Sequence, residues 1–134
     1  MKQSAFTRWH LPAILWAVFI LALTSYPRVE LPEMQIIGFD KVGHFGIYFI
    51  FTLLVIRAVF RYRSSLIRRA MKKSLLIAFL FAIFDEVHQM FIPGRFANVY
   101  DAIADMTGVV IAQLVFYFIA IPFCEKRNML YDEQ

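Results

Sequence analysis

Residues 42–60 of the chain read VGHFGIYFIFTLLVIRAVF, an apolar stretch whose ionisable residues, His44 and Arg57, lie near its two ends. A helix rises about 1.5 Å per residue, so this stretch nearly covers the roughly 30 Å hydrocarbon core of a bilayer. Three further apolar blocks lie at residues 9–26, 73–92 and 99–123. Four spans cannot close a barrel. The sequence therefore predicts an all-α, integral membrane four-helix bundle with helices at about 9–26, 41–60, 73–92 and 99–123.

The composition supports this class and excludes others. Of the 134 residues, 60% are hydrophobic and 18% are charged, which is more apolar than an ordinary soluble domain. This much apolar surface also excludes a disordered chain. One cysteine cannot form a disulfide within the chain, so a disulfide scaffold is excluded too. The length allows one domain, which we expect to span residues 1–134.

Basic residues predict the orientation of the spans. The segment 57–73 holds seven arginine and lysine residues and no acidic residue. By the positive-inside rule this connection is cytoplasmic, and four crossings then place both termini in the cytoplasm. Eleven of the fourteen basic residues lie on this inner side, and seven of the ten acidic residues lie toward the outside. This sidedness explains the net charge of +4, so we expect no nucleic-acid partner.

The first apolar block is also compatible with a cleaved signal peptide, because it has a basic start and an apolar run of suitable length. It lacks a good small-residue cleavage site: Ala22-Leu23-Thr24 is a poor match. We therefore expect a retained helix.

Polar side chains interrupt three of the expected helices. Asp40, His44 and Tyr48 fall within one 80° arc of the second helix when 100° is allowed per residue. The third helix has its polar residues in its second half, where we place Asp85, Glu86 and Gln89 on one face. The fourth helix begins with Asp101 and Asp105, in line with Gly108 and Ala112. The set proposed as a ligand-binding site is Asp40, Lys41, His44, Tyr48, Asp85, Glu86, Gln89, Arg95, Asp101 and Asp105.

The depth of these residues predicts where they meet. All three polar stripes lie in the outer halves of their helices, so we expect them to converge on one vestibule that opens outward. Asp85 and Glu86 would lie at its floor, and Arg95 would fold over it. A charge at this depth costs a few kcal/mol and has to pair, lose its charge or face water. The competing interpretation is that these groups only hold helices together. We favour a functional site because three helices contribute at matching depths.

Three short motifs, in order on successive helices, resemble one family. They are Asp40-Lys41-x-x-His44-Phe45-x-x-Tyr48, Asp85-Glu86-x-x-Gln89-x-Phe91-x-Pro93-x-Arg95 and Asp101-x-x-x-Asp105-x-x-Gly108. Ser25 matches a serine common near the end of the first helix. On the basis of these residues, the chain is similar to the VanZ-like family. The resemblance extends from about Ser25 to Ala112. It departs from the family's usual pattern at Asp105, where asparagine is common, and at Ala112, where a later glycine is common.

The resemblance implies a small protein of the bacterial cytoplasmic membrane with several spans. The family takes its name from a protein linked to resistance to the glycopeptide teicoplanin, so the resemblance implies a role in envelope physiology without naming a reaction.

One functional hypothesis is a binding module. Carboxylates and an arginine suit the head group of an amphiphile, such as a membrane lipid, a lipid-linked wall precursor or a glycopeptide-type antibiotic. Phe45, Phe49, Phe91, Phe96 and Tyr100 would cover its acyl chain. Most of the 15 phenylalanines are better explained as lipid-facing or interfacial anchors.

The alternative is a membrane-embedded enzyme that acts on a lipid or a lipid-linked wall precursor. Its candidate catalytic residues are Asp40, His44, Asp85, Glu86 and Asp101. His44, Glu86 and Asp101 are candidate ligands of a divalent metal, because zinc, manganese and iron accept nitrogen and oxygen ligands. No known catalytic signature supports a particular reaction. A proton or ion relay is disfavoured because the inner half of every span lacks acidic groups.

Overall fold

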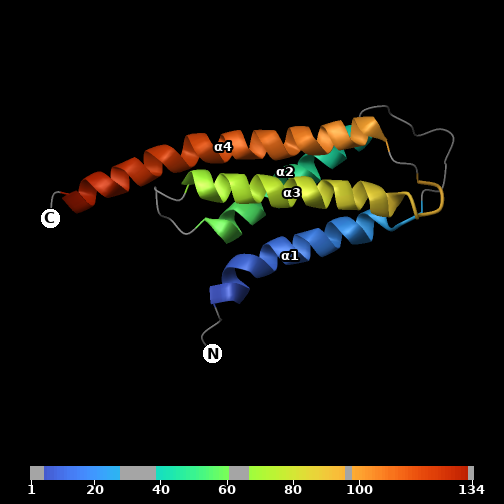
Figure 1. Ribbon diagram of the computed structural model, residues 1–134, viewed down its shortest axis with the longest axis horizontal. Helices are drawn as coiled ribbons and strands as arrows, with labels where there is room; N and C mark the ends of the chain where they lie inside the picture. Colours follow the sequence, from blue (N-terminus) through green and yellow to red (C-terminus); the bar gives the residue numbers. More distant parts are fainter. Residues whose placement is uncertain (1–4, 28–38, 61–66, 96–97, 133–134) are drawn as a thin grey trace.

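Four helices make up the described part of the chain: α1 (Ala5–Thr24), α2 (Phe39–Val59), α3 (Ile67–Gln89) and α4 (Val99–Asp132) (Figure 1). The computed structural model describes residues 5–27, 39–60, 67–95 and 98–132, and it has no strand in these ranges. The predicted all-α fold with four helices is confirmed. Phe96 and part of the basic segment, residues 61–66, lie outside the described residues.

The helix ends differ from the predicted spans by one to nine residues everywhere except at the start of α4. α3 begins at Ile67, inside the basic segment, and α4 continues to Asp132, beyond the apolar block that ends at residue 123. α3 ends at Gln89 rather than at residue 92. The chain turns directly afterwards, and Gly94 has a φ of 75°, which glycine adopts at low cost.

Three of the helices in the described residues are long and apolar enough to cross a membrane. Their spanning segments are Thr7–Thr24 in α1, Asp40–Val59 in α2 and Val99–Ala120 in α4. α3 is less apolar on average because its first turns are basic and its last turns carry Asp85 and Glu86. The protein is thus built from membrane-type helices together with one helix of mixed character.

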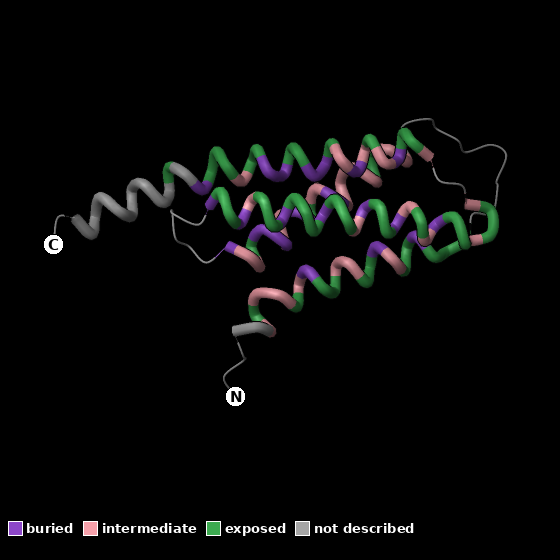
Figure 2. Tube along the Cα trace, viewed as in Figure 1, coloured by how far each residue is buried: buried purple, intermediate pink, exposed green. Residues whose placement is uncertain are grey.

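α3 has its large apolar side chains on the outside. Its buried residues are mostly small or polar, and its exposed residues include Leu76, Leu80 and Phe84. Figure 2 shows this pattern as exposed stretches along the outer side of α3. In a water-soluble bundle such leucine and phenylalanine side chains face the core. The reversed arrangement is typical of a helix that meets lipid on one side and packs through small residues on the other.

The closest helix pair is α2 and α4. A Cβ atom added to Gly108 of α4 would overlap the backbone carbonyl of Phe45 and lie 3.0 Å from the backbone nitrogen of Phe49. Only glycine allows the two backbones to come this close. Ala112, one turn further along α4, is fully buried. The small-residue face of α4 therefore packs within the chain.

α1 is less closely attached. It contacts α2 and, weakly, α3, and it diverges from the other helices toward its first residues (Figure 1). The indole nitrogen of Trp16 donates a hydrogen bond to the carbonyl of Ile47 at 3.0 Å, which joins the middle of α1 to α2.

Both ends of the bundle have a distinct character. The start of α1, the end of α2, the start of α3 and the end of α4 lie at one end, where the first turns of α3 are basic. At the other end, α1 and α3 finish and α2 and α4 begin (Figure 1). We call this second end the polar end, because Asp40, His44, Glu86, Asp101 and Asp105 gather there.

A polar cluster around His44 as candidate functional site

The first turns of α2 and α4 face each other through an ion pair. The ammonium of Lys41 contacts the carboxylate of Asp101 and lies 3.4 Å from that of Asp40. The side chains of Lys41 and Asp40 are about one-third exposed, whereas that of Asp101 is nearly buried. Asp40 and Asp101 are each in the first turn of a helix, where the helix dipole favours a negative charge. The outer part of the polar end is therefore charged and accessible.

His44 lies one turn deeper on α2 and is surrounded by carboxylates. Its Nδ1 atom is 3.0 Å from Oδ1 of Asp105. Its Nε2 atom is 4.0 Å from an oxygen of Asp40 and 4.0 Å from an oxygen of Asp101. The imidazole thus joins the exposed ion pair on one side to a deeper acidic residue on the other.

Glu86 brings α3 into the same group. Donor atoms of His44, Glu86 and Asp105 all lie within 4.8 Å of one another, and so do those of Asp40, His44 and Asp101. The carboxylate of Glu86 also accepts a hydrogen bond from the backbone of Asn98, the residue that caps α4. We call the six residues Asp40, Lys41, His44, Glu86, Asp101 and Asp105 the His44 cluster.

Two oxygen atoms of this cluster are buried without a hydrogen-bond partner: Oδ2 of Asp105 and Oε1 of Glu86. Asp105 is completely shielded from solvent. Buried polar atoms are normally paired, since an unpaired one costs free energy. The cluster therefore has unused capacity to accept a hydrogen bond or to ligate a cation.

A second network surrounds Asp85, which is also completely buried. One of its carboxylate oxygens accepts a hydrogen bond from the hydroxyl of Thr24 at 2.7 Å. The other oxygen accepts hydrogen bonds from the hydroxyl of Tyr48 and from the amide of Gln89, each at 3.2 Å. Asp85 thus links α3 to the end of α1 and to the middle of α2.

Arg95 completes this second network from the turn after α3. Its guanidinium donates to the side-chain carbonyl of Gln89 at 3.0 Å and to the backbone carbonyls of Leu23 and Tyr26 at 3.1 Å. These carbonyls belong to the last turn of α1 and the residues after it, where helices leave acceptors without intrahelical partners. We call Thr24, Tyr48, Asp85, Gln89 and Arg95 the Asp85 network.

The ten residues predicted for the site form two groups, the six of the His44 cluster and four of the Asp85 network. Asp85 and Gln89 face α1 and α2, whereas Glu86 faces His44 and Asp105. Asp85, Gln89 and Glu86 span about 100° of the circumference of α3, so this side of the helix contacts two sets of partners. Arg95 does not cover a vestibule but binds α1. With Asp85 fully buried among its partners, it does not form the floor of an open vestibule.

Two further contacts were not predicted. Thr24 makes the shortest hydrogen bond to Asp85. A threonine in an apolar span does not stand out in the sequence as a site residue. The hydroxyl of Ser25 lies 3.4 Å from Nε2 of His88. The family resemblance points to Ser25, but only the structure shows that Ser25 lies next to His88.

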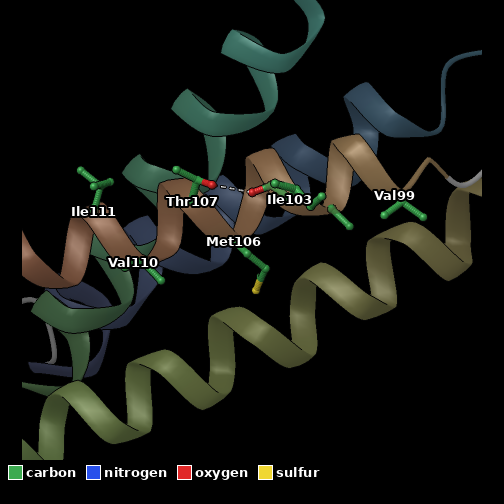
Figure 3. Close-up of a pocket in the computed structure, with 7 residues that line it drawn as sticks. Val99, Ile103, Met106, Thr107, Val110 and Ile111 are labelled. Carbon is green, nitrogen blue, oxygen red and sulfur yellow. Dashed lines mark hydrogen bonds between the residues drawn. The ribbon is translucent and has the colours of Figure 1, made fainter.

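An apolar groove with a volume of about 440 Å³ runs along α4 near the polar end (Figure 3). Its lining residues are Val99, Ala102, Ile103, Met106, Thr107, Val110 and Ile111. The hydroxyl of Thr107 is bonded to the carbonyl of Ile103 at 2.7 Å, so the groove offers little free polarity. Helical periodicity places most of these residues on the side of α4 opposite Asp101 and Asp105. The groove and the His44 cluster are therefore separate features.

The fold and its polar end define a small helical membrane protein with buried acidic groups between its helices. The VanZ/LLP1 family model matches residues 5–120, which is most of the chain, and the protein belongs to this family. Neither a curated protein nor a solved structure shows a significant match.

Proposed function

We propose that this VanZ-family protein spans the bacterial cytoplasmic membrane and binds, on its outer side, the head group of an amphiphilic envelope component or of a glycopeptide-type antibiotic. Binding would alter the sensitivity of the envelope to such compounds. The observation that carries the proposal is the excess of carboxylates in the His44 cluster, where four acidic residues accompany Lys41 and His44. An amine on the head group would be attracted to this acidic end.

The exposed part of the polar end supports this proposal. Asp40 and Lys41 are accessible enough to contact a ligand. Phe91 and Tyr100 are about three-quarters exposed on the neighbouring α3–α4 turn and α4, at the level where aromatic side chains meet lipid head groups. The α4 groove would accept part of an acyl chain, independently of the head group.

The orientation is tested by fusion reporters. The positive-inside rule predicts a cytoplasmic C-terminus and an outward α3–α4 turn. Green fluorescent protein fused after Gln134 should fluoresce, and alkaline phosphatase inserted after Pro93 should be active. Fluorescence at the turn combined with phosphatase activity at the C-terminus would reverse the orientation and place the polar end in the cytoplasm.

Amphiphile binding is tested with a lipoglycopeptide that carries a free amine. Asp40→Asn should weaken binding to the detergent-purified protein about two- to fivefold, the range expected for one exposed ion pair. The control Glu125→Gln removes one carboxylate from the opposite part of α4 and should leave the affinity unchanged. The N-acetylated ligand should bind the unmodified protein more weakly. Equal binding of both ligands, or no effect of Asp40→Asn, would contradict a role for the acidic end.

The alternative function is a membrane-embedded enzyme that acts on a lipid or a lipid-linked wall precursor. Its support is the position of His44 among carboxylates from three helices. The two functions differ in the fate of the ligand: a binding protein returns the amphiphile intact, whereas an enzyme converts it. Mass spectrometry of the amphiphile recovered after incubation separates the two.

A further inference from the structure

The inner part of the His44 cluster has the composition of a metal site. His44, Glu86 and Asp105 come from three different helices, and their donor atoms lie within 4.8 Å of one another. Donors around a tetrahedral ion at about 2.0–2.2 Å lie roughly 3.4 Å apart, so small side-chain rotations would bring these atoms to ligand distance. One imidazole nitrogen and two carboxylates suit zinc or manganese.

The two unpartnered oxygens provide an independent indication. Oδ2 of Asp105 and Oε1 of Glu86 are buried and unpaired, and both belong to this inner group. Without a metal, a hydrogen bond from Nδ1 of His44 satisfies only the other oxygen of Asp105, and a metal bound to Nδ1 would replace this bond. A cation between the two carboxylates would occupy the unused acceptors of both residues. Their two negative charges would balance the charge of a divalent ion.

The surroundings of His44 fit a ligand role. Nδ1 faces Asp105, whereas Nε2 lies 4.0 Å from Asp40 and 4.0 Å from Asp101. Histidines that ligate a metal through one ring nitrogen commonly donate the other N–H to a carboxylate, which orients the ring. Asp40 and Asp101 are the nearest acceptors for that N–H, each 4.0 Å away, and Lys41 neutralises part of their charge.

We propose that Nδ1 of His44 and the carboxylates of Glu86 and Asp105 bind one divalent transition-metal ion, oriented by Asp40 and Asp101. Three protein ligands leave a position for water or for a ligand oxygen. This site does not depend on the proposed amphiphile, so metal binding and amphiphile binding are tested separately. The competing account is a protonated His44 that pairs with Asp105 without a metal.

The experiment measures the metal content of detergent-purified protein. The protein is stripped with a chelator, incubated with zinc or manganese alone and desalted, and its metal is quantified by plasma mass spectrometry. The unmodified protein should retain about one ion per chain. His44→Ala, Glu86→Gln and Asp105→Asn should each lose it, while the control His88→Ala, at a histidine outside the cluster, should retain it. Less than about one-tenth of an ion in the unmodified protein would overturn the proposal.

Asp101→Asn distinguishes the inner group from the outer group of Asp40, His44 and Asp101. If Asp101 only orients His44, the variant should bind the metal about 10- to 100-fold more weakly but still reach full occupancy. Loss of binding in Asp101→Asn together with retention in Glu86→Gln would overturn the assignment to the inner group. Glu86 is only half-buried, so Glu86→Gln keeps the test valid where Asp105→Asn fails to fold. Metal should also raise the melting temperature of the unmodified protein and not that of Glu86→Gln.

Discussion

Replacing Gly108 with alanine should destabilise the bundle more than the same change at Gly43 or Gly46. The new Cβ would overlap the carbonyl of Phe45 and crowd the nitrogen of Phe49. Both are backbone atoms of α2, so a side-chain rotation cannot relieve the contact, and α2 and α4 must move apart. We expect a loss of about 1–3 kcal/mol, the usual cost of overpacking. Thermal unfolding of the detergent-solubilised protein, followed by circular dichroism, measures it.

Gly46→Ala is the matched control for this variant. A Cβ at Gly46 would have no atom within 4 Å, and the residue lies on α2, the same helix that Gly108 contacts. Alanine favours the helix over glycine by about 1 kcal/mol, so this variant should be neutral or slightly more stable. A Gly108→Ala protein as stable as Gly46→Ala would contradict the close approach of α2 and α4.

Removing the carboxylate of Asp85 should have an effect of similar or greater size. Asp85→Ala leaves the hydroxyls of Thr24 and Tyr48 and the amide of Gln89 without their shared acceptor. The hydroxyl of Thr24 keeps the backbone carbonyl of Ile20 as an acceptor at 3.0 Å, so the stranded donors are those of Tyr48 and Gln89. At about 1 kcal/mol for each of them, with a cavity in addition, the loss should reach roughly 2–4 kcal/mol. Unfolding in increasing concentrations of a denaturing detergent measures it.

Two companion variants identify the cause of the Asp85 effect. Asp85→Asn keeps one acceptor oxygen and should lose less than half as much stability. Thr24→Val removes one donor with little change in shape, and in the Asp85→Ala background it should cost nothing further, because the bond is already absent. Strictly additive effects of Thr24→Val and Asp85→Ala would show that the bond does not contribute to stability.

The helices could be predicted because apolar blocks of about 20 residues have few alternatives. The ends of the helices could not be predicted in the same way. An apolar block indicates which residues cross the membrane, whereas a helix continues beyond them for as long as the following residues favour helix. α4 therefore extends to Asp132 and α3 begins at Ile67, each through charged residues that are adequate helix formers.

The residues of the candidate site could be predicted, but their grouping could not. Ionisable residues in apolar helices stand out in a sequence, so His44, Asp85 and Asp105 are recognised directly. The division of these residues into two groups depends on how α3 is rotated about its own axis, because this rotation directs Asp85 to Thr24 and Glu86 to His44. That rotation follows from packing through small residues such as Ala78 and Ala82, which a helical pattern does not reveal.

The mixed character of α3 has a consequence for biogenesis. An aspartate costs about 2.5–3.5 kcal/mol at the centre of a span on translocon-based scales, and a leucine returns only about 0.3–0.6 kcal/mol, so even a part of that cost outweighs several leucines. Asp85 and Glu86 therefore work against independent insertion of α3, although leucine and phenylalanine cover its outer side. The groups that accommodate these two carboxylates come from α1, α2 and α4. We expect α3 to enter the bilayer stably only together with its neighbours, so that insertion and folding of this helix are a single event.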